Sequence, residues 1–148
     1  LKSSIELQGV QMFWKKKGEP YEQTESIAQG VMSSLLDSTL SDKFVINPHT
    51  SVGIGIVDIL INYFNGKTVN SFLIEIKIVR SKADLENGIQ QLFNYQKNKK
   101  AKTSVRLIIN LLEEEFEDSE RQEGEFRQVD VSINVNPPRP SDLDKRKK

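Results

Sequence analysis

Two carboxylates and a lysine occur in a pattern that suits metal-assisted chemistry. Asp58 interrupts the apolar run 57–61, and Glu75 and Lys77 interrupt the apolar run 72–78 at alternate positions. Both runs are rich in β-branched residues, which predicts strands. Because side chains alternate between the two faces of a strand, Glu75 and Lys77 should share one face. Carboxylate oxygens are ligands that Mg²⁺ prefers, and a neighbouring lysine supplies positive charge where negative charge develops.

A tight turn should join the two runs. Asn65-Gly66 lies between them and is a strong hairpin signal, because both central residues of such a turn need positive φ. If these two residues form the loop, Asp58 lies opposite Leu73 and diagonal to Glu75. Asp58, Leu73, Glu75 and Lys77 then share a face. Diagonal side chains are roughly 7–8 Å apart, close enough for two carboxylates to share one divalent cation.

Charged groups on an otherwise apolar sheet need partners, because an unpaired buried charge is costly and two carboxylates repel each other. A bound cation would neutralise Asp58 and Glu75. An ion pair between Asp58 and Lys77, or a face open to solvent, would meet the same need. Both interpretations remain open from these residues alone.

The length of 148 residues predicts one domain, over 1–136, followed by a disordered basic tail at 137–148. The absence of Cys excludes disulfides and thiolate metal sites and favours a cytoplasmic or intracellular location. His49 follows Asn47-Pro48 in a turn-like stretch and is expected at the surface, so we expect no histidine chemistry near the carboxylates. No apolar run approaches the roughly 20 residues that span a bilayer, so no membrane role is expected.

Charge gives little information about partners, since 21 Lys and Arg balance 21 Asp and Glu. Lysines gather at 15–17, at 97–102 and in the last four residues, and each group is typical of a solvated surface. The closing Lys145-Arg146-Lys147-Lys148 also resembles a nuclear-import signal. A start at Leu1 instead of Met favours a segment of a longer multidomain protein.

The periodicity of the chain predicts an α/β fold. Pro20 suits the first turn of a helix, and Ser81 to Asp84 resembles a capping box that starts another. Residues 113–124 form an acidic connector, either helical or mobile. The expected order is helix 22–36, strand 44–46, strand 57–61, strand 72–78, helix 81–97 and strand 104–111, with an additional half-buried strand at 126–135.

Three polar residues flank the apolar stripes of the helices. Glu25 lies at the edge of the first stripe, where it either faces a site or complements the helix dipole in solvent. Gln91 and Tyr95 are four residues apart, so they rise side by side on the second helix. Gly53 and Gly55, ahead of Asp58, suggest a bulge or the close approach of another backbone, such as that of a nucleic acid.

This order of elements resembles the PD-(D/E)XK nuclease superfamily, which has a restriction-endonuclease-like αβββαβ core with a mixed central sheet flanked by helices. Three segments carry the resemblance: Gly55-Ile56-Val57-Asp58, Glu75-Ile76-Lys77 and Gln91-Leu92-Phe93-Asn94-Tyr95. The Gln-x-x-x-Tyr pattern resembles RecB-type members. The resemblance covers residues 20–112, and it departs from the family at Val57, where the motif has proline.

The resemblance implies a nuclease in which Asp58, Glu75 and the carbonyl of Ile76 hold Mg²⁺, with Mn²⁺ as a substitute. Lys77 would assist the attacking water, Glu25 would complete the acidic site, and Gln91 with Tyr95 would position metal ligands and substrate. The implied substrate is DNA, with RNA as the alternative, and cleavage is endo- or exonucleolytic. The resemblance also suggests a homodimer, because many members that cut both strands act as dimers.

A narrower resemblance lies in the first helix. Glu25-Ser26-Ile27-Ala28-Gln29-Gly30 looks like the corresponding segment of a branch found in mobile elements and in toxins of intracellular bacteria, such as nuclease modules of cytoplasmic-incompatibility factors. Two alternatives to an active nuclease stand beside it. One is an inactive module with the same fold that binds nucleic acid or protein. The other is a structural domain in which Asp58, Glu75 and Lys77 form an internal ion-pair network.

Overall fold

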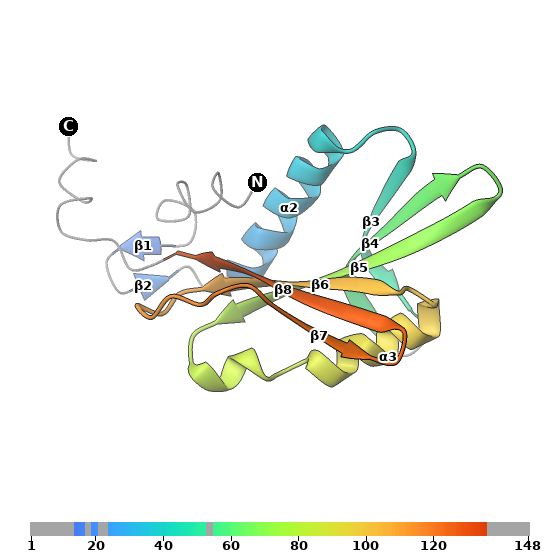
Figure 1. Cartoon of the computed structure of the whole chain (residues 1–148). Helices are drawn as coiled ribbons and strands as arrows, with labels where there is room; N and C mark the ends of the chain where they lie inside the picture. The colour runs from blue at the N-terminus through green and yellow to red at the C-terminus, as the bar shows by residue number, and fades with distance from the viewer. Residues whose placement is uncertain (1–13, 17–18, 21–23, 53–54, 136–148) are drawn as a thin grey trace.

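The computed structural model describes residues 14–16, 19–20, 24–52 and 55–135 of the chain. Its centre is a six-stranded mixed sheet with the strand order β3-β4-β5-β6-β8-β7 (Figure 1). The strands are β3 (Phe44–Ser51), β4 (Ile56–Asn65), β5 (Thr68–Val79), β6 (Thr103–Asn110), β7 (Ser119–Glu123) and β8 (Phe126–Asn134). The expected α/β class is therefore confirmed.

Two helices, α2 (Thr24–Thr39) and α3 (Ile89–Lys99), cover opposite faces of the sheet (Figure 1). Ala28 and Met32 of α2 pack in the larger core with alternate residues of β4, β5, β6 and β8. On the other face, Leu92 and Tyr95 of α3 pack against Leu73 of β5. The apolar stripes predicted for the two helices thus pack against the sheet.

The N-terminal part differs from expectation. Pro20 was expected in the first turn of a helix, but it lies in the short strand β2 (Glu19–Pro20), which pairs with β1 (Trp14–Lys16). Helix α2 begins at Thr24. The tail at 137–148 and Gly53 lie outside the described residues. No helix in the described ranges is long and apolar enough to cross a membrane.

The β4–β5 hairpin has a register two residues away from the predicted one. Asn65 pairs with Thr68, so the loop consists of Gly66 and Lys67. Gly66 has φ +62, whereas Lys67 is not among the residues with positive φ, so the turn needs left-handed backbone at one position only. A shift of two residues leaves the alternation of faces unchanged. Val57 is the exception, because it packs with Leu60 and Leu73 and not with the predicted partners Ile59 and Ile61. The shift moves Asp58 from a diagonal position to one directly opposite Glu75.

Strand β3 is longer than the predicted strand 44–46. It continues through Pro48 to Ser51 and pairs antiparallel with β4. Proline was expected to end the strand, but β3 is the edge of the sheet, where a missing backbone N–H costs no ladder hydrogen bond on the open side. Pro48 lies opposite Ile59 and Thr50 opposite Val57, so His49 lies level with Asp58, at an intervening position that is not a regular pair.

The capping box forms, but it does not start α3. The Asp84 carboxylate accepts hydrogen bonds from the backbone N–H groups of Arg80 and Ser81, both at 2.9 Å, and caps the single 3₁₀ turn η1 (Lys82–Leu85). Gly88 then adopts φ +83, which breaks the helical path, and α3 starts at Ile89. The predicted helix 81–97 is therefore a 3₁₀ turn followed by a shorter helix.

The acidic connector was expected to be helical or mobile, yet residues 119–123 form β7, an antiparallel partner of β8. Strand β8 lies where it was predicted and runs parallel to β6. The prediction of a half-buried strand with an exposed polar face was wrong, because Gln128, Asp130 and Ser132 are more buried than the valines between them. Elements packed on both faces of the sheet produce this burial.

Candidate functional site

Asp58 and Glu75 lie where the β4–β5 ladder ends, one position beyond its last pair, Ile59 and Ile74. The Asp58 backbone N–H donates to Glu75 Oε1 at 3.3 Å. The Ile76 backbone N–H donates to Asp58 Oδ2 at 2.7 Å. Each carboxylate therefore bonds the backbone of the facing strand, and the two side chains are fixed between β4 and β5.

A cavity of about 120 Å³ opens beside Glu75. It collects residues from α2, β5, β6 and the start of α3. Its lining consists of Glu25, Glu75, Ile76, Lys77, Asn87, Gly88, Gln91 and Arg106. Five residues predicted from the sequence thus meet in one cavity, and Asp58 joins them through Glu75. Glu25 is exposed at its rim, and Lys77 is half-buried.

The electrostatics favour a cation or a proton at Glu75. Burial, together with the negative charge of Asp58 and a smaller effect from Glu25, raises the pKa of Glu75 to about 8. Lys77 makes no ion pair with any residue in the described ranges. The Asp58–Lys77 ion pair, which was the alternative to a bound cation, is therefore not formed in the described ranges.

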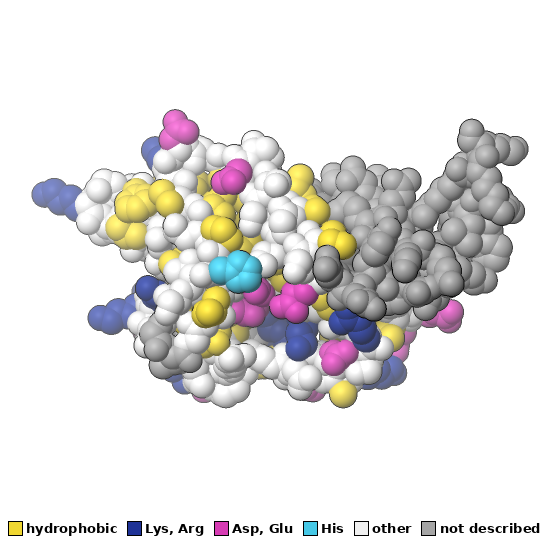
Figure 2. Space-filling model, turned by 180° about the vertical axis from the view of Figure 1, so that it is seen from behind, with side chains coloured by type: hydrophobic (Ala, Val, Ile, Leu, Met, Phe, Trp, Pro, Cys, Tyr) yellow, Lys and Arg dark blue, Asp and Glu magenta, His cyan; other side chains and the backbone are white. Residues whose placement is uncertain are grey.

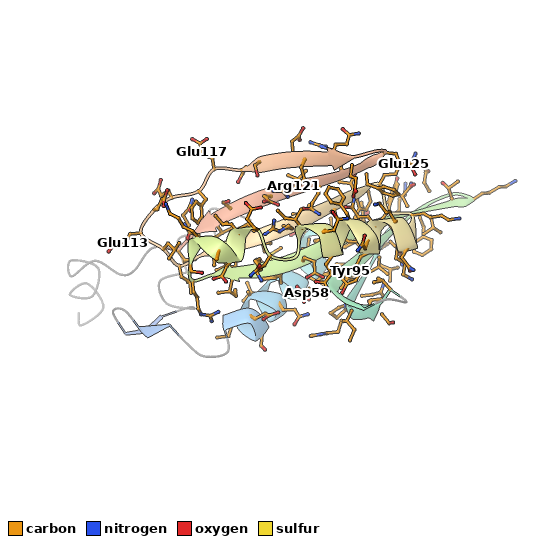
Figure 3. All side chains as sticks on the ribbon, turned by 90° about the horizontal axis from the view of Figure 1, so that it is seen from below. Asp58, Tyr95, Glu113, Glu117, Arg121 and Glu125 are labelled. Atoms are coloured by element: carbon orange, nitrogen blue, oxygen red, sulfur yellow. The ribbon has the colours of Figure 1, made fainter. Side chains whose placement is uncertain are left out.

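Gln91 and Tyr95 lie side by side as predicted, but they differ in environment. Gln91 is exposed at the cavity, whereas Tyr95 is buried with 4% of its surface exposed. Gln91 Nε2 donates to Tyr95 Oη at 2.8 Å. Figure 3 shows Tyr95 on α3 and Asp58 in the same part of the molecule. Tyr95 therefore contributes as a buried support for Gln91.

Gly55 explains how Tyr95 fits. A Cβ atom added at Gly55 would stand 2.8 Å from the ring carbon Cζ of Tyr95, closer than real Cβ contacts. The sequence suggested that another backbone approaches here, but the group that approaches is the phenol ring. Because Gly55 precedes β4 by one residue, the Tyr95 ring supports the segment that leads to Asp58.

Gln29 of α2 is a site residue to which the sequence analysis gave no role. Its Nε2 donates to the backbone carbonyl of Asp58 at 3.2 Å, and its side chain is 9% exposed. It thereby connects α2 to the strand that carries the first carboxylate. Its spacing in the sequence could have predicted this position, because Gln29 is four residues after Glu25 and therefore lies on the same side of the helix.

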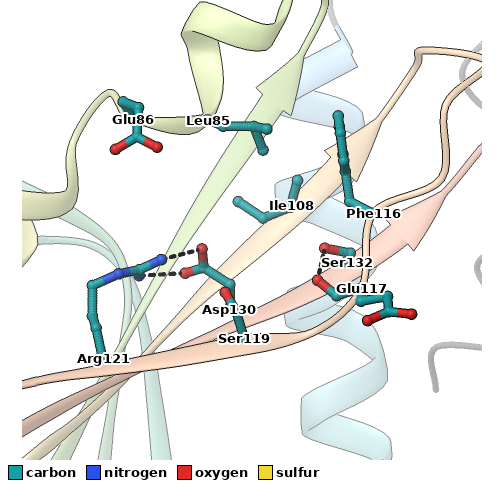
Figure 4. A pocket seen from close by; sticks show the side chains of 9 residues that line it. All are labelled: Leu85, Glu86, Ile108, Phe116, Glu117, Ser119, Arg121, Asp130 and Ser132. Carbon is teal, nitrogen blue, oxygen red and sulfur yellow. Dashed lines mark hydrogen bonds and ion pairs between the residues drawn. The ribbon is translucent and has the colours of Figure 1, made fainter.

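Arg106 is a second unpredicted residue, a buried charge within the apolar run of β6, directly opposite Glu75. Its Nη2 donates to the Leu85 carbonyl, and its Nη1 lies 3.5 Å from Asp130 Oδ2. Asp130 is also bound by both terminal nitrogens of Arg121, at 2.8 and 2.7 Å (Figure 4). Arg121 and Asp130 of this network line a second cavity of about 210 Å³.

His49 corrects the expectation that no histidine lies near the carboxylates. It is exposed, as predicted, but the extended β3 puts it level with Asp58. Its φ of +49 is left-handed, a conformation uncommon for residues other than glycine. On the face in Figure 2, the single histidine (cyan) lies next to acidic side chains (magenta), with Lys and Arg side chains (blue) beyond them.

The donors present fit a hard cation that keeps most of its water. In the described ranges, no group of three His, Asp or Glu side chains converges closely enough to enclose a metal ion. Mg²⁺ does not need such a cage, because one or two carboxylates, waters and substrate oxygens complete its shell. Asp58 and Glu75 provide two carboxylates at a cavity, and burial together with the charge of Asp58 raises the pKa of Glu75, which a bound cation would offset.

The chain belongs to the family described as Domain of unknown function (DUF8371), whose model matches residues 1–113. The matched segment includes α2, β3, β4, β5, α3 and β6, and therefore every predicted site residue. Strands β7 and β8 follow it. No curated protein and no solved structure matches the chain.

Proposed function

We propose that this member of the DUF8371 family is a Mg²⁺-dependent nuclease that hydrolyses phosphodiester bonds of DNA. The observation that carries the proposal is the pairing of Asp58 and Glu75 across adjacent strands, with Lys77 on the same strand and face as Glu75. The order α2, β3, β4, β5, α3, β6 supports it, since this is the αβββαβ order that the resemblance to PD-(D/E)XK nucleases implies.

The role proposed for each site residue follows from where it lies at the cavity. Asp58 and Glu75, with the Ile76 carbonyl, would hold the metal, and Glu25 at the rim would bind one of its waters. A bound Mg²⁺ would neutralise the phosphate and lower the pKa of a water molecule. Lys77 would stabilise the negative charge that develops on the phosphate during attack.

Other residues of the chain orient this site. Gln29 holds the Asp58 carbonyl, which fixes the start of β4 against α2. Gln91 presents its amide at the cavity and is fixed by Tyr95. Such fixed polar groups allow substrate binding without reorganisation at the moment of reaction. No role in proton transfer is needed from Tyr95, because it is buried.

The test is cleavage of labelled linear, circular and single-stranded DNA, and of RNA, with Mg²⁺, Mn²⁺ or EDTA. The decisive variant is Asp58→Asn, because an amide oxygen still accepts the Ile76 hydrogen bond while the negative charge is lost. We expect metal-dependent cleavage by the wild type and none by Asp58→Asn, with both proteins equally folded by circular dichroism. Asp42→Asn, a change to an exposed carboxylate in the α2–β3 connection, is the matched control.

Cleavage that survives Asp58→Asn would contradict the mechanism. Absence of cleavage by the wild type, together with absence of Mg²⁺ or Mn²⁺ binding in calorimetry, would favour a second function. That function is a catalytically inactive module with the same fold that binds nucleic acid or protein. One observation favours it: both carboxylates already accept backbone hydrogen bonds, which leaves fewer lone pairs for a metal.

A further inference from the structure

The segments that run from the candidate site to the C-terminal end of α3 contain no acidic residue. Residues 59–74 and 87–112 contain neither Asp nor Glu, although they include the hairpin, α3 and β6. The second segment carries lysines at its centre: Lys97, Lys99, Lys100 and Lys102. Lys97 is already paired with Glu123 of β7, at 3.2 Å. The other three are exposed.

These three lysines line a cleft of about 340 Å³ at the C-terminal end of α3. We call it the lysine cleft and define it by Val69, Asn70, Ser71 and Phe72 of β5 and Lys99, Lys100, Lys102 and Thr103 opposite them. Val69 is 54% and Phe72 36% exposed. The cleft thus combines positive charge, uncharged polar groups and apolar surface.

The cleft exists because β5 is longer than its partner β6. The β5–β6 ladder begins at Phe72 and Thr103, so residues 68–71 of β5 pair with β4 but have no β6 residue beside them. Ser71 is four residues before Glu75 on the same strand, which is roughly 13 Å at the rise of a β-strand. The cleft and the candidate site therefore lie along one strand, with α3 beside both.

We propose that the lysine cleft binds the backbone of an unpaired nucleic-acid strand whose scissile phosphate lies at Asp58 and Glu75. This inference rests on the proposed function and specifies its substrate as single-stranded. Three lysines without described acidic partners match phosphates, and the exposed Phe72 and Val69 offer apolar contact to unpaired bases, which a duplex keeps stacked inside.

The backbone conformation of Lys100 indicates that its side chain serves binding and not folding. Lys100 ends α3 in the left-handed region, with φ +55, and its N–H donates to the carbonyls of Gln96 and Lys97. Glycine or asparagine usually occupies this position, since other side chains are strained there. A lysine side chain gives nothing to this cap, whereas it lines the cleft. Lys100→Gly therefore separates binding from folding.

The experiment measures binding of a fluorescent single-stranded DNA oligonucleotide to the full chain by anisotropy, in EDTA, across a range of salt. A Lys99→Gln, Lys102→Gln double variant is compared with a Lys43→Gln, Lys82→Gln double variant, which removes the same charge outside the cleft. If both cleft lysines contact phosphates, the slope of log affinity against log salt falls by about 1.4 in the first variant. It stays at the wild-type value in the second.

Lys100→Gly gives the second arm. We expect about tenfold weaker binding with a melting temperature equal to or above that of the wild type. A duplex of the same sequence should compete at least tenfold less well than the single strand. An RNA oligonucleotide of the same sequence tests whether the cleft prefers DNA or RNA. Equal salt slopes in the two double variants, or equal competition by duplex, would overturn the inference.

The outcome is separable from that of the proposed function because binding is measured without metal. Cleft-dependent binding without cleavage in Mg²⁺ would support the cleft and contradict the nuclease. If the wild type cleaves DNA and the cleft variants bind and cleave it equally well, the nuclease is supported and the role of the cleft is contradicted. Failure of the wild type to bind any oligonucleotide would overturn the inference and assign the open β5 edge to another partner, such as an extended peptide.

Discussion

Asp58 and Glu75 each bond the strand that carries the other: the Asp58 N–H donates to Glu75 Oε1, and the Asp58 carboxylate accepts from the N–H of Ile76. Two acidic side chains thus replace ordinary ladder hydrogen bonds at the end of a hairpin. The arrangement fixes both groups in a buried place and brings like charges together, and the pKa of Glu75 is raised first by burial and then by the charge of Asp58.

The pKa of Glu75 makes stability depend on pH. The group has a pKa of 4.5 when unperturbed and about 8 in the fold, so the folded protein retains a proton that the unfolded chain loses. Stability should therefore fall as pH rises from about 4.5 to about 8. Glu75→Gln should flatten this fall and raise the melting temperature at pH 8. Parallel curves for the two proteins would contradict this explanation. Mg²⁺ at pH 8 should stabilise only the wild type.

Lys77 should contribute to rate and not to metal binding. Lys77→Met keeps the length of the side chain but removes its charge from the cavity. We expect cleavage to slow by about 10²–10³-fold, as for the loss of one group that stabilises developing charge. The Mg²⁺ affinity measured by calorimetry should not fall. Weaker metal binding by this variant would assign Lys77 to a different role.

Gly55 and Tyr95 should be energetically coupled. Gly55→Ala introduces a Cβ that meets the Tyr95 ring, and such overpacking costs about 1–3 kcal/mol of unfolding free energy. Tyr95→Leu makes room but loses the Gln91 hydrogen bond. The double variant should therefore lose less stability than the sum of the single variants, as measured by urea denaturation. Additive losses would show that the cost of Gly55→Ala does not arise from contact with the Tyr95 ring.

His49 should act on the reaction at the neighbouring carboxylate. Asparagine tolerates left-handed backbone well, so His49→Asn should preserve the fold to within about 0.5 kcal/mol. Its loss of an imidazole level with Asp58 should slow cleavage about tenfold or more. Thr50→Ala, next to it on β3, is the control. Unchanged cleavage by His49→Asn would leave this histidine as a surface residue.

The Asp130 network should contribute strongly to stability. Asp130 is 7% exposed and binds Arg121 and the buried Arg106, so Asp130→Ala leaves two unpaired cations. We expect a loss of about 3–5 kcal/mol. Glu120→Ala removes the carboxylate of an exposed pair with Arg127 and should cost less than about 1 kcal/mol. Similar losses for the two variants would contradict the assignment of Asp130 to the core.

Much of the local structure could be predicted because it depends on periodicity. Alternation with period 2 assigned Asp58, Glu75 and Lys77 to one face, and a register error of two residues left this unchanged. The spacing of Gln91 and Tyr95 implied contact on any helix, and the hydrogen bond between them forms. Helix boundaries were less predictable, because Gly88 interrupts a run whose capping box is intact.

The sequence by itself determined which residues face the candidate site, because that information is carried by neighbours a few positions apart. Only the tertiary structure decided which distant residues join them. His49 lies level with Asp58 because an edge strand tolerates Pro48 and continues past it, and Arg106 lies opposite Glu75 because parallel pairing of β5 with β6 sets that register. Such pairings depend on the free energy of the whole sheet, and no local pattern in the sequence encodes them.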